Sequence, residues 1–510
     1  MRPRALLAAV LLLGAAAAPP ASAQAPAFAP GALTAGDRLF PGVGNGGYDA
    51  THYAIALRYR PRTRGVRATA TMTATATQDL SSFGLDLQGL RVRSVHVDGA
   101  PARFARRRPP GRRERSKLVV TPAAGIRAGS AFTVTVRYGG RARPVVDPDG
   151  SWEGLIPTDT GAVALGEPIG TMGWAPVNAT PADKATFAVS ITVPRGLWGI
   201  SNGTLVQRRT RGGWTTHRWR EDAPMAPYLA TATVGRYDVR RARTPGGIPL
   251  FNAVDVAADT NRIATAGRRR GAPLPAITPA RLRRVHAELS RQGATLDVLA
   301  AAFGPYPFST GGAIVVNAPY VGYALEVQTK PVYVDRDLHA LTHELAHQWW
   351  GDSVGFREWS DIWLAEGFAV WSEWHVAHQA GGPSPAQEWE RRWALSERER
   401  TRGGTRLREL WKPAIPQTAQ DLFGLAVYDR GAMTVEGLRQ IVGDDAFWRI
   451  LRTWQAERRH GTGTTADFVA LAERESGLEL DAYFDEWLRR AGKPRLTPAQ
   501  VRAAQAPVTR

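Results

Sequence analysis

The sequence predicts a multidomain α+β protein, in which a β-rich half precedes a half that ends in helices. From about residue 48 to residue 239, apolar and polar residues alternate as they do in strands. Beyond Pro245-Gly246-Gly247 the apolar residues recur at helical spacing instead. A chain of 510 residues, of which 44% are hydrophobic, is long enough to bury two or three cores.

Strands are expected in the first half, where segments alternate or are rich in Thr and Val, with Gly, Pro and Asp at the joins. The clearest segments are residues 52–59, 66–77, 94–98, 132–138 and 187–193. Helices are expected in the second half, at residues 279–303, 337–350, 362–379, 387–400, 428–442 and 445–460. Gly381-Gly382-Pro383 should end the third of these helices.

The start of the chain has the pattern of a secretory signal peptide. Arg2 and Arg4 supply the positive end, residues 5–18 the apolar stretch, and Ala21-Ser22-Ala23 the small-residue cleavage site. The apolar stretch is too short to span a bilayer. We therefore expect a secreted protein, divided into a signal peptide (1–23), a β-rich N-terminal domain (24–245), a second domain with C-terminal helices (246–492) and a tail (493–510).

Composition excludes some chemistry. The chain has no cysteine, so thiol catalysis and cysteine metal ligands are excluded. The net charge is +19, and much of the excess lies at residues 106–117 and 268–270. Pro and Gly interrupt these two runs, and neither run contains an aromatic residue that could stack on a base. This pattern favours solvated loops over a nucleic-acid groove. No nucleic-acid partner is expected, whereas weak attraction to an anionic cell envelope stays open.

A metal motif is the strongest signal in the chain. His343, Glu344 and His347 form His-Glu-x-x-His, and Glu366 follows after 18 intervening residues. One helical turn places both histidines on one face. Two imidazole nitrogens and a carboxylate make a catalytic zinc set with a fourth position for water, so one zinc ion per chain is expected. Glu344 is placed to act as general base, whereas in the alternative reading both histidines merely satisfy core hydrogen bonds.

Further runs match one known family. They are Lys184-Ala-Thr-Phe187, Ser201-Asn-Gly203, Gly304-Pro-Tyr-Pro-Phe308, Tyr323-Ala-Leu-Glu326, Gln348-Trp-Trp-Gly-Asp352, Trp363-Leu-Ala-Glu-Gly-Phe-Ala369 and Tyr428-Asp-Arg-Gly-Ala432. With the zinc motif, they make the chain resemble the gluzincin aminopeptidases, the aminopeptidase N family, from about residue 48 to residue 496. The resemblance implies a thermolysin-like catalytic domain over residues 246–492.

The resemblance also implies roles for the matching residues. His343, His347 and Glu366 would hold zinc, Glu344 would be the base, and Tyr428 would donate a hydrogen bond to the tetrahedral oxyanion.

Glu326 and Glu167 correspond to the family's ligands for the free α-amine of the substrate. The chain departs from the family pattern at four neighbouring positions, which are Met172, Tyr323, Leu325 and Val327. Glu373 lies two turns after Glu366 and either accepts a hydrogen bond from a zinc-binding imidazole or is solvated.

These roles predict a secreted zinc aminopeptidase that removes N-terminal residues from peptide substrates. Two alternatives stay open. Larger members of the family carry a long helical domain that closes the site, whereas here only a short segment, including residues 484–489, follows the predicted helices. The cleft is therefore expected to be more open, which would suit an endopeptidase. A zinc protein with little catalysis that binds the cell envelope is the other alternative, suggested by the positive charge.

Overall fold

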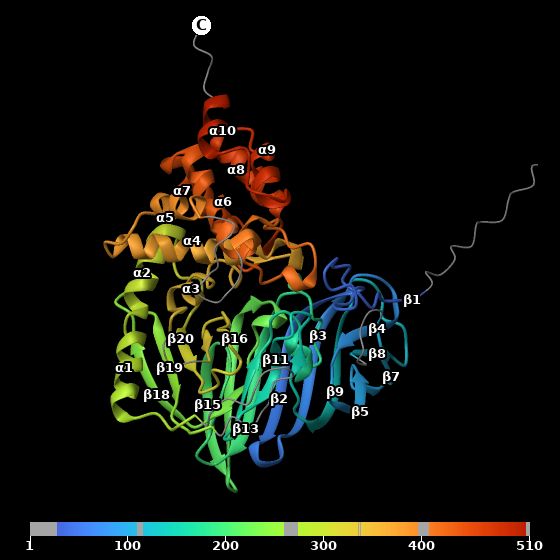
Figure 1. Cartoon of the computed structure of the whole chain (residues 1–510). Helices are drawn as coiled ribbons and strands as arrows, with labels where there is room; N and C mark the ends of the chain where they lie inside the picture. Colours follow the sequence, from blue (N-terminus) through green and yellow to red (C-terminus); the bar gives the residue numbers. More distant parts are fainter. Residues whose placement is uncertain are drawn as a thin grey trace, which may run out of the picture.

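The computed structural model describes residues 28–109, 116–259, 274–334, 336, 338–395 and 407–505. The predicted signal peptide lies outside these residues. Figure 1 shows the β-sheets at one end of the molecule and most of the helices at the other end, as the sequence predicts. The α+β fold class is therefore confirmed.

The largest sheet has eight strands in the order β15-β16-β13-β2-β3-β9-β5-β6. Alternate residues of β13 are buried, because successive side chains of a strand point to opposite faces. The five strands predicted from alternation all lie in this sheet. Its members are β2 (Tyr48–Arg60), β3 (Gly65–Ala76), β5 (Arg91–Val97), β6 (Ala100–Pro101), β9 (Ala131–Arg141), β13 (Ala185–Pro194), β15 (Thr204–Arg211) and β16 (Trp214–Met225).

Two smaller sheets complete the first half. One has the order β1-β4-β8-β7 and the other the order β10-β11-β12-β17-β14. Their strands are β1 (Ala29–Pro30), β4 (Leu80–Asp86), β7 (Arg103–Arg107), β8 (Lys117–Thr121), β10 (Val145–Val146), β11 (Trp152–Pro157), β12 (Ala162–Leu165), β14 (Trp198–Ile200) and β17 (Thr233–Gly235).

The basic run 106–117 is not simply the loop that we expected. Its two ends belong to the paired strands β7 and β8. Lys117 is buried and pairs with Asp86 at 2.6 Å, which explains how a charged side chain is accommodated there. The second basic run, 268–270, lies outside the described residues.

A four-stranded sheet, in the order β18-β19-β20-β21, connects the two halves. It comprises β18 (Tyr237–Arg243), β19 (Pro249–Asp255), β20 (Gly311–Val315) and β21 (Val332–Tyr333). The turn at Pro245-Gly246-Gly247 joins β18 to β19, which are paired strands of this sheet. The two-domain division stays a proposal, and the pairing favours a boundary ahead of Tyr237.

The second half is mainly helical. Its helices are α1 (Pro279–Leu289), α2 (Gln292–Phe303), α3 (Leu341–Ala346), α4 (Trp363–Gln379), α5 (Pro385–Trp393), α6 (Gly431–Val442), α7 (Asp444–Glu457), α8 (Thr465–Ser476), α9 (Asp481–Phe484) and α10 (Pro498–Gln505). The short parallel strands β22 (Gly355–Phe356) and β23 (Thr462–Gly463) pair between them. Two single turns of π-helix, η7 (Ala426–Arg430) and η8 (Asp485–Arg489), precede α6 and follow α9.

Several predicted helix bounds were wrong. The segment 279–303 is two helices, α1 and α2, and the segment 337–350 is helical only over α3. Helix α5 ends at Trp393, and residues 396–400 of the predicted helix lie outside the described part. Helix α10 occupies part of the expected tail, where Val501 is buried.

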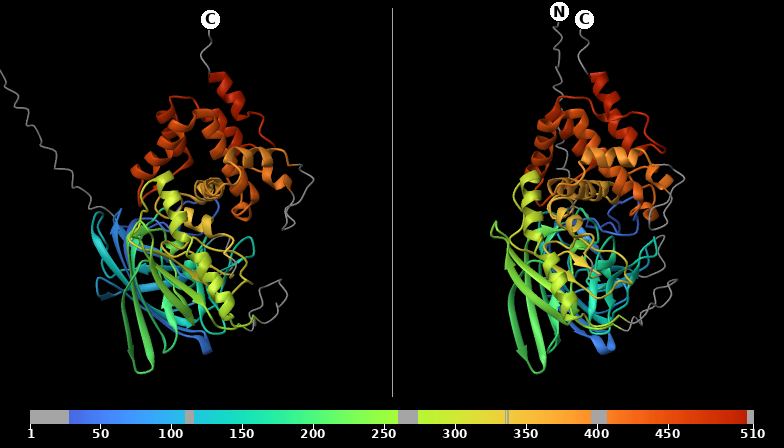
Figure 2. Two further views of the ribbon diagram at one scale, coloured as in Figure 1. Left: turned by 90° about the vertical axis from the view of Figure 1, so that its left-hand side faces the viewer. Right: turned by 60° about the vertical axis from the view of Figure 1, so that its left-hand side comes forward.

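Helix α3, which carries the His-Glu-x-x-His motif, and helix α4, which carries Glu366, lie where the two halves meet. Figure 2 shows helices α5 to α10 at one end of the molecule, with α4 between them and the sheets. Helix α3 packs against α4 at this junction. Within the described residues, none of the helices has the length and apolar character needed to cross a membrane.

Candidate active site

Helices α3 and α4 bring the three predicted zinc ligands together. His343 lies inside α3, and His347 is the residue that ends it, still in helical conformation. Glu366 lies in the first turn of α4. Its Oε2 is 3.1 Å from Nε2 of His343 and 3.5 Å from Nε2 of His347. The helical spacing therefore aims both imidazoles at one carboxylate, and the reading as core histidines is not favoured.

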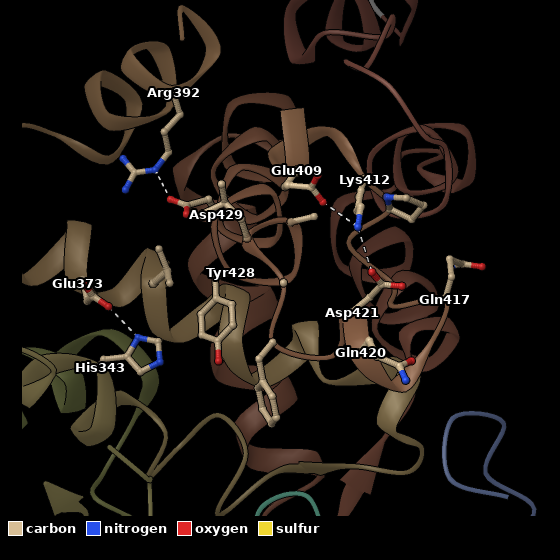
Figure 3. Close-up of a pocket in the computed structure, with 16 residues that line it drawn as sticks. His343, Glu373, Arg392, Glu409, Lys412, Gln417, Gln420, Asp421, Tyr428 and Asp429 are labelled. Atoms are coloured by element: carbon tan, nitrogen blue, oxygen red, sulfur yellow. Dashed lines mark hydrogen bonds and ion pairs between the residues drawn. The ribbon is translucent and has the colours of Figure 1, made fainter. Parts of the chain in front are cut away.

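The other nitrogen of each imidazole is already engaged. Nδ1 of His343 lies 2.7 Å from Oε1 of Glu373, and Nδ1 of His347 lies 2.9 Å from the carbonyl oxygen of Trp350. Figure 3 shows Glu373 beside His343. Such contacts orient metal-binding imidazoles and leave Nε2 free to coordinate. Glu373 thus makes the contact that the sequence left open.

These donors fit a zinc ion. One ligand atom from each of His343, His347 and Glu366 lies within 4.8 Å of the others, and all three side chains are largely buried. Two nitrogens and one carboxylate oxygen, with room for a further ligand, are the donor set of catalytic zinc sites.

Glu344 and Tyr428 line the same cavity as the zinc donors. Burial raises the pKa of Glu344 to about 8, although both histidines act in the opposite direction. The positive charge of a bound zinc ion would lower this pKa and favour the carboxylate form that a general base needs. The ring of Tyr428 stacks on that of His343, with centroids 6.0 Å apart. Burial and nearby carboxylates raise the pKa of Tyr428 well above its usual value, so its hydroxyl keeps its proton.

Arg430 fixes the π-helical turn that carries Tyr428. Its guanidinium is fully buried and donates to six backbone carbonyl oxygens. The acceptors belong to Trp411, Lys412, Glu486, Trp487, Arg490 and Gly492. Sequence reasoning matched Arg430 only as part of a motif and gave it no role.

Glu326 and Glu167 also line this cavity, which has a volume of about 140 Å³. They are 3% and 8% exposed, and Oε1 of each has no hydrogen-bond partner in the described part of the chain. Burial and neighbouring carboxylates raise the pKa of Glu167 well above its usual value. Met172, which departs from the family pattern near Glu167, is buried. Glu167 nevertheless lines the cavity.

A larger cavity of about 860 Å³ adjoins the first and shares His343, Phe423 and Tyr428 with it. Figure 3 shows Tyr428 between the Glu373–His343 pair and a charged cluster around Lys412. Its charged residues pair among themselves: Arg392 with Asp429 at 2.6 Å, and Lys412 with Glu409 at 2.7 Å. This cavity provides space for a chain that extends away from the zinc donors.

Three cavity residues were missed by sequence reasoning. Asp149 and Ser151 lie in the turn between β10 and β11, and Phe423 lies in the loop before η7. These loops have neither the periodicity nor the motif that singles out a functional residue.

The fold and the donor set together define the zinc metallopeptidase class with a His-Glu-x-x-His motif. Two family models match the chain: the peptidase M1 N-terminal domain at residues 49–229 and the peptidase family M1 domain at residues 326–487. Together they cover more than half of the chain, in the order that the resemblance predicts. The chain belongs to peptidase family M1.

Solved structures and curated relatives agree with this assignment. An M1 zinc metallopeptidase from Deinococcus radiodurans, bound to a Tyr-Ser-Ala substrate, superimposes with a TM-score of 0.76 and 26% identity, over 91% of this chain and 99% of that one. Aminopeptidase M1 of Arabidopsis thaliana is 25% identical over 356 residues, which are 65% of this chain and 37% of the relative. Aminopeptidase N of Streptomyces lividans is 27% identical over 207 residues, 38% of this chain and 23% of the relative. The chain thus spans well under half the length of these two curated relatives.

Proposed function

We propose that this protein is a zinc aminopeptidase that hydrolyses the first peptide bond of peptides with a free N-terminus. The observation that carries the proposal is the pair of buried, unsatisfied carboxylate oxygens of Glu167 and Glu326 in the cavity of the zinc donors. A buried carboxylate without a partner is costly, and an ammonium group supplies the missing donor. Neither the endopeptidase nor the envelope-binding alternative accounts for this pair.

The proposed chemistry assigns a step to each residue. His343, His347 and Glu366 would hold zinc, which when bound would supply a Lewis acid for the substrate carbonyl and for the attacking water. The carboxylate of Glu344 takes the proton of the attacking water and passes it to the leaving amine. The hydroxyl of Tyr428 donates to the oxygen that becomes negatively charged.

The two glutamates determine where the peptide is cut. An α-ammonium group bound to Glu167 and Glu326 places the first carbonyl, and no later one, beside the zinc donors. A blocked, neutral N-terminus leaves both carboxylates unpaired, which penalises its binding.

The test compares free and N-acetylated forms of the same tripeptides. We expect kcat/KM for the free peptides to exceed that for the acetylated ones by at least about a hundredfold, because a site built for a charged group rejects an analogue that lacks it. Only single N-terminal residues should be released. Internal cleavage of acetylated peptides at the rate of the free ones would overturn the proposal.

We also propose that the protein is exported, on the basis of the pattern in residues 1–23. Mass spectrometry of the full-length chain expressed in a secreting bacterial host tests this. A mature N-terminus at Gln24 in the exported fraction is expected, whereas intact Met1 in the cytoplasmic fraction would contradict it.

A further inference from the structure

The cavity that contains Glu167 and Glu326 has an end that the proposed reaction leaves unused. A substrate with its amine at these glutamates and its first carbonyl at the zinc donors must place its first side chain in the same cavity. The rest of the peptide extends into the larger cavity, which shares Phe423 and Tyr428 with the first. The remaining wall consists of Asp149, Ser151, Tyr323 and Ala324, with Phe423.

A tight turn between β10 and β11 fixes the position of Asp149. The backbone of Asp147 accepts from Gly150 N at 2.9 Å and donates to the carbonyl of Ser151 at 3.1 Å. Oδ1 of Asp149 accepts from Ser151 N at 2.7 Å. Asp149 is exposed at the edge of the cavity, and none of the ion pairs in the described part of the chain includes it, so its negative charge is available to a ligand there.

Tyr323 joins this turn to the segment that carries Glu326. Its hydroxyl donates to the carbonyl oxygen of Trp152 at 2.7 Å, directly after the turn. The phenol ring of Tyr323 and the ring of Phe423 both line the cavity. The wall thus combines two aromatic residues, Tyr323 and Phe423, with a carboxylate at Asp149.

We propose that Asp149 determines specificity for the N-terminal residue and that the protein prefers peptides beginning with Lys or Arg. The inference rests on the proposed aminopeptidase function. The long aliphatic stem of Lys or Arg packs along the Tyr323 and Phe423 rings, and its charged end pairs with Asp149. An uncharged side chain of equal length gains the packing but not the ion pair.

The proposed preference for Lys and Arg rests on more than the number of acidic residues in the cavity. Glu167 and Glu326 are both more than nine-tenths buried and line the same cavity, and Oε1 of each has no hydrogen-bond partner among the described residues. These oxygens favour a cationic group as the ligand of the cavity. One ammonium group suffices for these two glutamates. Asp149, on the turn that Tyr323 holds, is a further anionic group, suited to a second positive charge on the same substrate residue.

The test measures kcat/KM of the full-length zinc-loaded protein for the 4-nitroanilides of Arg, Lys, norleucine and leucine. Norleucine is the matched control substrate, because it has the unbranched stem without the charge. We expect Arg and Lys to exceed norleucine by at least about tenfold, mostly through KM, as expected for a charge-assisted contact to a substrate. The variants are Asp149→Asn and Asp149→Glu, with Asp445→Asn on α7 as an exposed control.

In Asp149→Asn the Arg-to-norleucine ratio should fall by about five- to tenfold, whereas Asp149→Glu should retain much of the preference. Asp445→Asn should leave the ratio at the wild-type value. Equal rates for Arg and norleucine in the wild type would overturn the inference, and so would an equal loss on both substrates in Asp149→Asn. Hydrolysis of the leucine substrate without a preference for Arg would contradict the role of Asp149 but not the aminopeptidase function. No hydrolysis of any of the four 4-nitroanilides would contradict both.

Discussion

Among single residues, Glu373 is a partly exposed side chain that orients a ligand of the buried zinc site. Its carboxylate holds Nδ1 of His343 at 2.7 Å, and this contact directs Nε2 towards Glu366. We predict that Glu373→Ala lowers zinc affinity by about ten- to a hundredfold, because loss of such an orienting partner has that effect. Competition with a chelating dye measures it. Glu390→Ala, on the exposed face of α5, is the control, and an equal effect in both variants would contradict the role of Glu373.

A substitution at Tyr428 can distinguish a catalytic role of this residue from a role in stability. Tyr428→Phe removes the hydroxyl but keeps the ring that stacks on His343. If the hydroxyl stabilises the developing oxyanion, kcat should fall by a factor equivalent to about 2.7–4 kcal/mol, with zinc content and melting temperature close to wild type. A large drop in melting temperature with an unchanged kcat would instead make Tyr428 a core residue.

The sequence alone was sufficient to predict the zinc donors, because their spacing along the chain forms a recognisable motif. His343, His347 and Glu366 meet because helical spacing and helix packing follow from local sequence. The position of Glu167 could be inferred only through the resemblance, since a β-half loop places it beside a helix of the other half. Asp149 could not be found at all, because its place depends on the Tyr323 contact to Trp152 across the two halves.

At the scale of elements, periodicity located long amphipathic segments and failed for short buried ones. Strand β20 is buried throughout and β19 almost throughout, so neither shows the alternation that marked β2 or β13. The helical segment 279–303 was predicted as one helix because its apolar spacing continues through the break near Ser290 and Arg291. Neither of these two residues is a Gly or Pro, which would have indicated a helix end in the sequence.

The π-helical turn η7 depends on Arg430, and this dependence gives a prediction about stability. Arg430→Met leaves six carbonyl oxygens, three of them in fully buried contacts, without the guanidinium that they share. We expect the free energy of unfolding to fall by about 3 kcal/mol or more, since each buried acceptor left unpaired costs about 1–3 kcal/mol. Denaturant titration measures the change. The exposed neighbour Arg489→Met should stay within about 0.5 kcal/mol of wild type, and equal stabilities would contradict the role of Arg430.

At the scale of the whole molecule, the two halves meet around Lys184 of the β-half. Its ammonium group donates to the carbonyl oxygens of Asp352, Ser353 and Gly461 at 2.7, 2.8 and 3.1 Å. The turn at residues 351–353 lies a few residues after His347, and Lys184 directly precedes β13, so this contact connects the large sheet to the metal site. The run that contains Lys184 matched the family in the sequence, but its contacts became evident only in the folded chain.

The metal site also makes zinc binding depend on pH. Burial alone would lower the pKa of His343, but hydrogen bonds to Glu366 and Glu373 outweigh it and raise this pKa well above its usual value. Burial would also lower the pKa of His347, but the charge of Glu366, its hydrogen bond and the charge of Glu326 together outweigh burial and raise this pKa. Zinc binds the unprotonated rings, so it must displace protons, and affinity should rise with pH. From about pH 6 to about pH 8 we expect about a tenfold gain per pH unit for each proton released, and a pH-independent affinity would contradict this.

The most direct test of the account is the effect of Glu326→Ala on the discrimination between free and N-acetylated peptides. If this buried carboxylate binds the α-ammonium group, its removal should cost about 1.5–3 kcal/mol, which is what such a charge-assisted contact contributes. We predict that kcat/KM for free peptides falls by roughly ten- to a hundredfold with zinc retained, and that the ratio of free to acetylated rates narrows. An unchanged ratio in a variant that keeps its zinc would contradict the account.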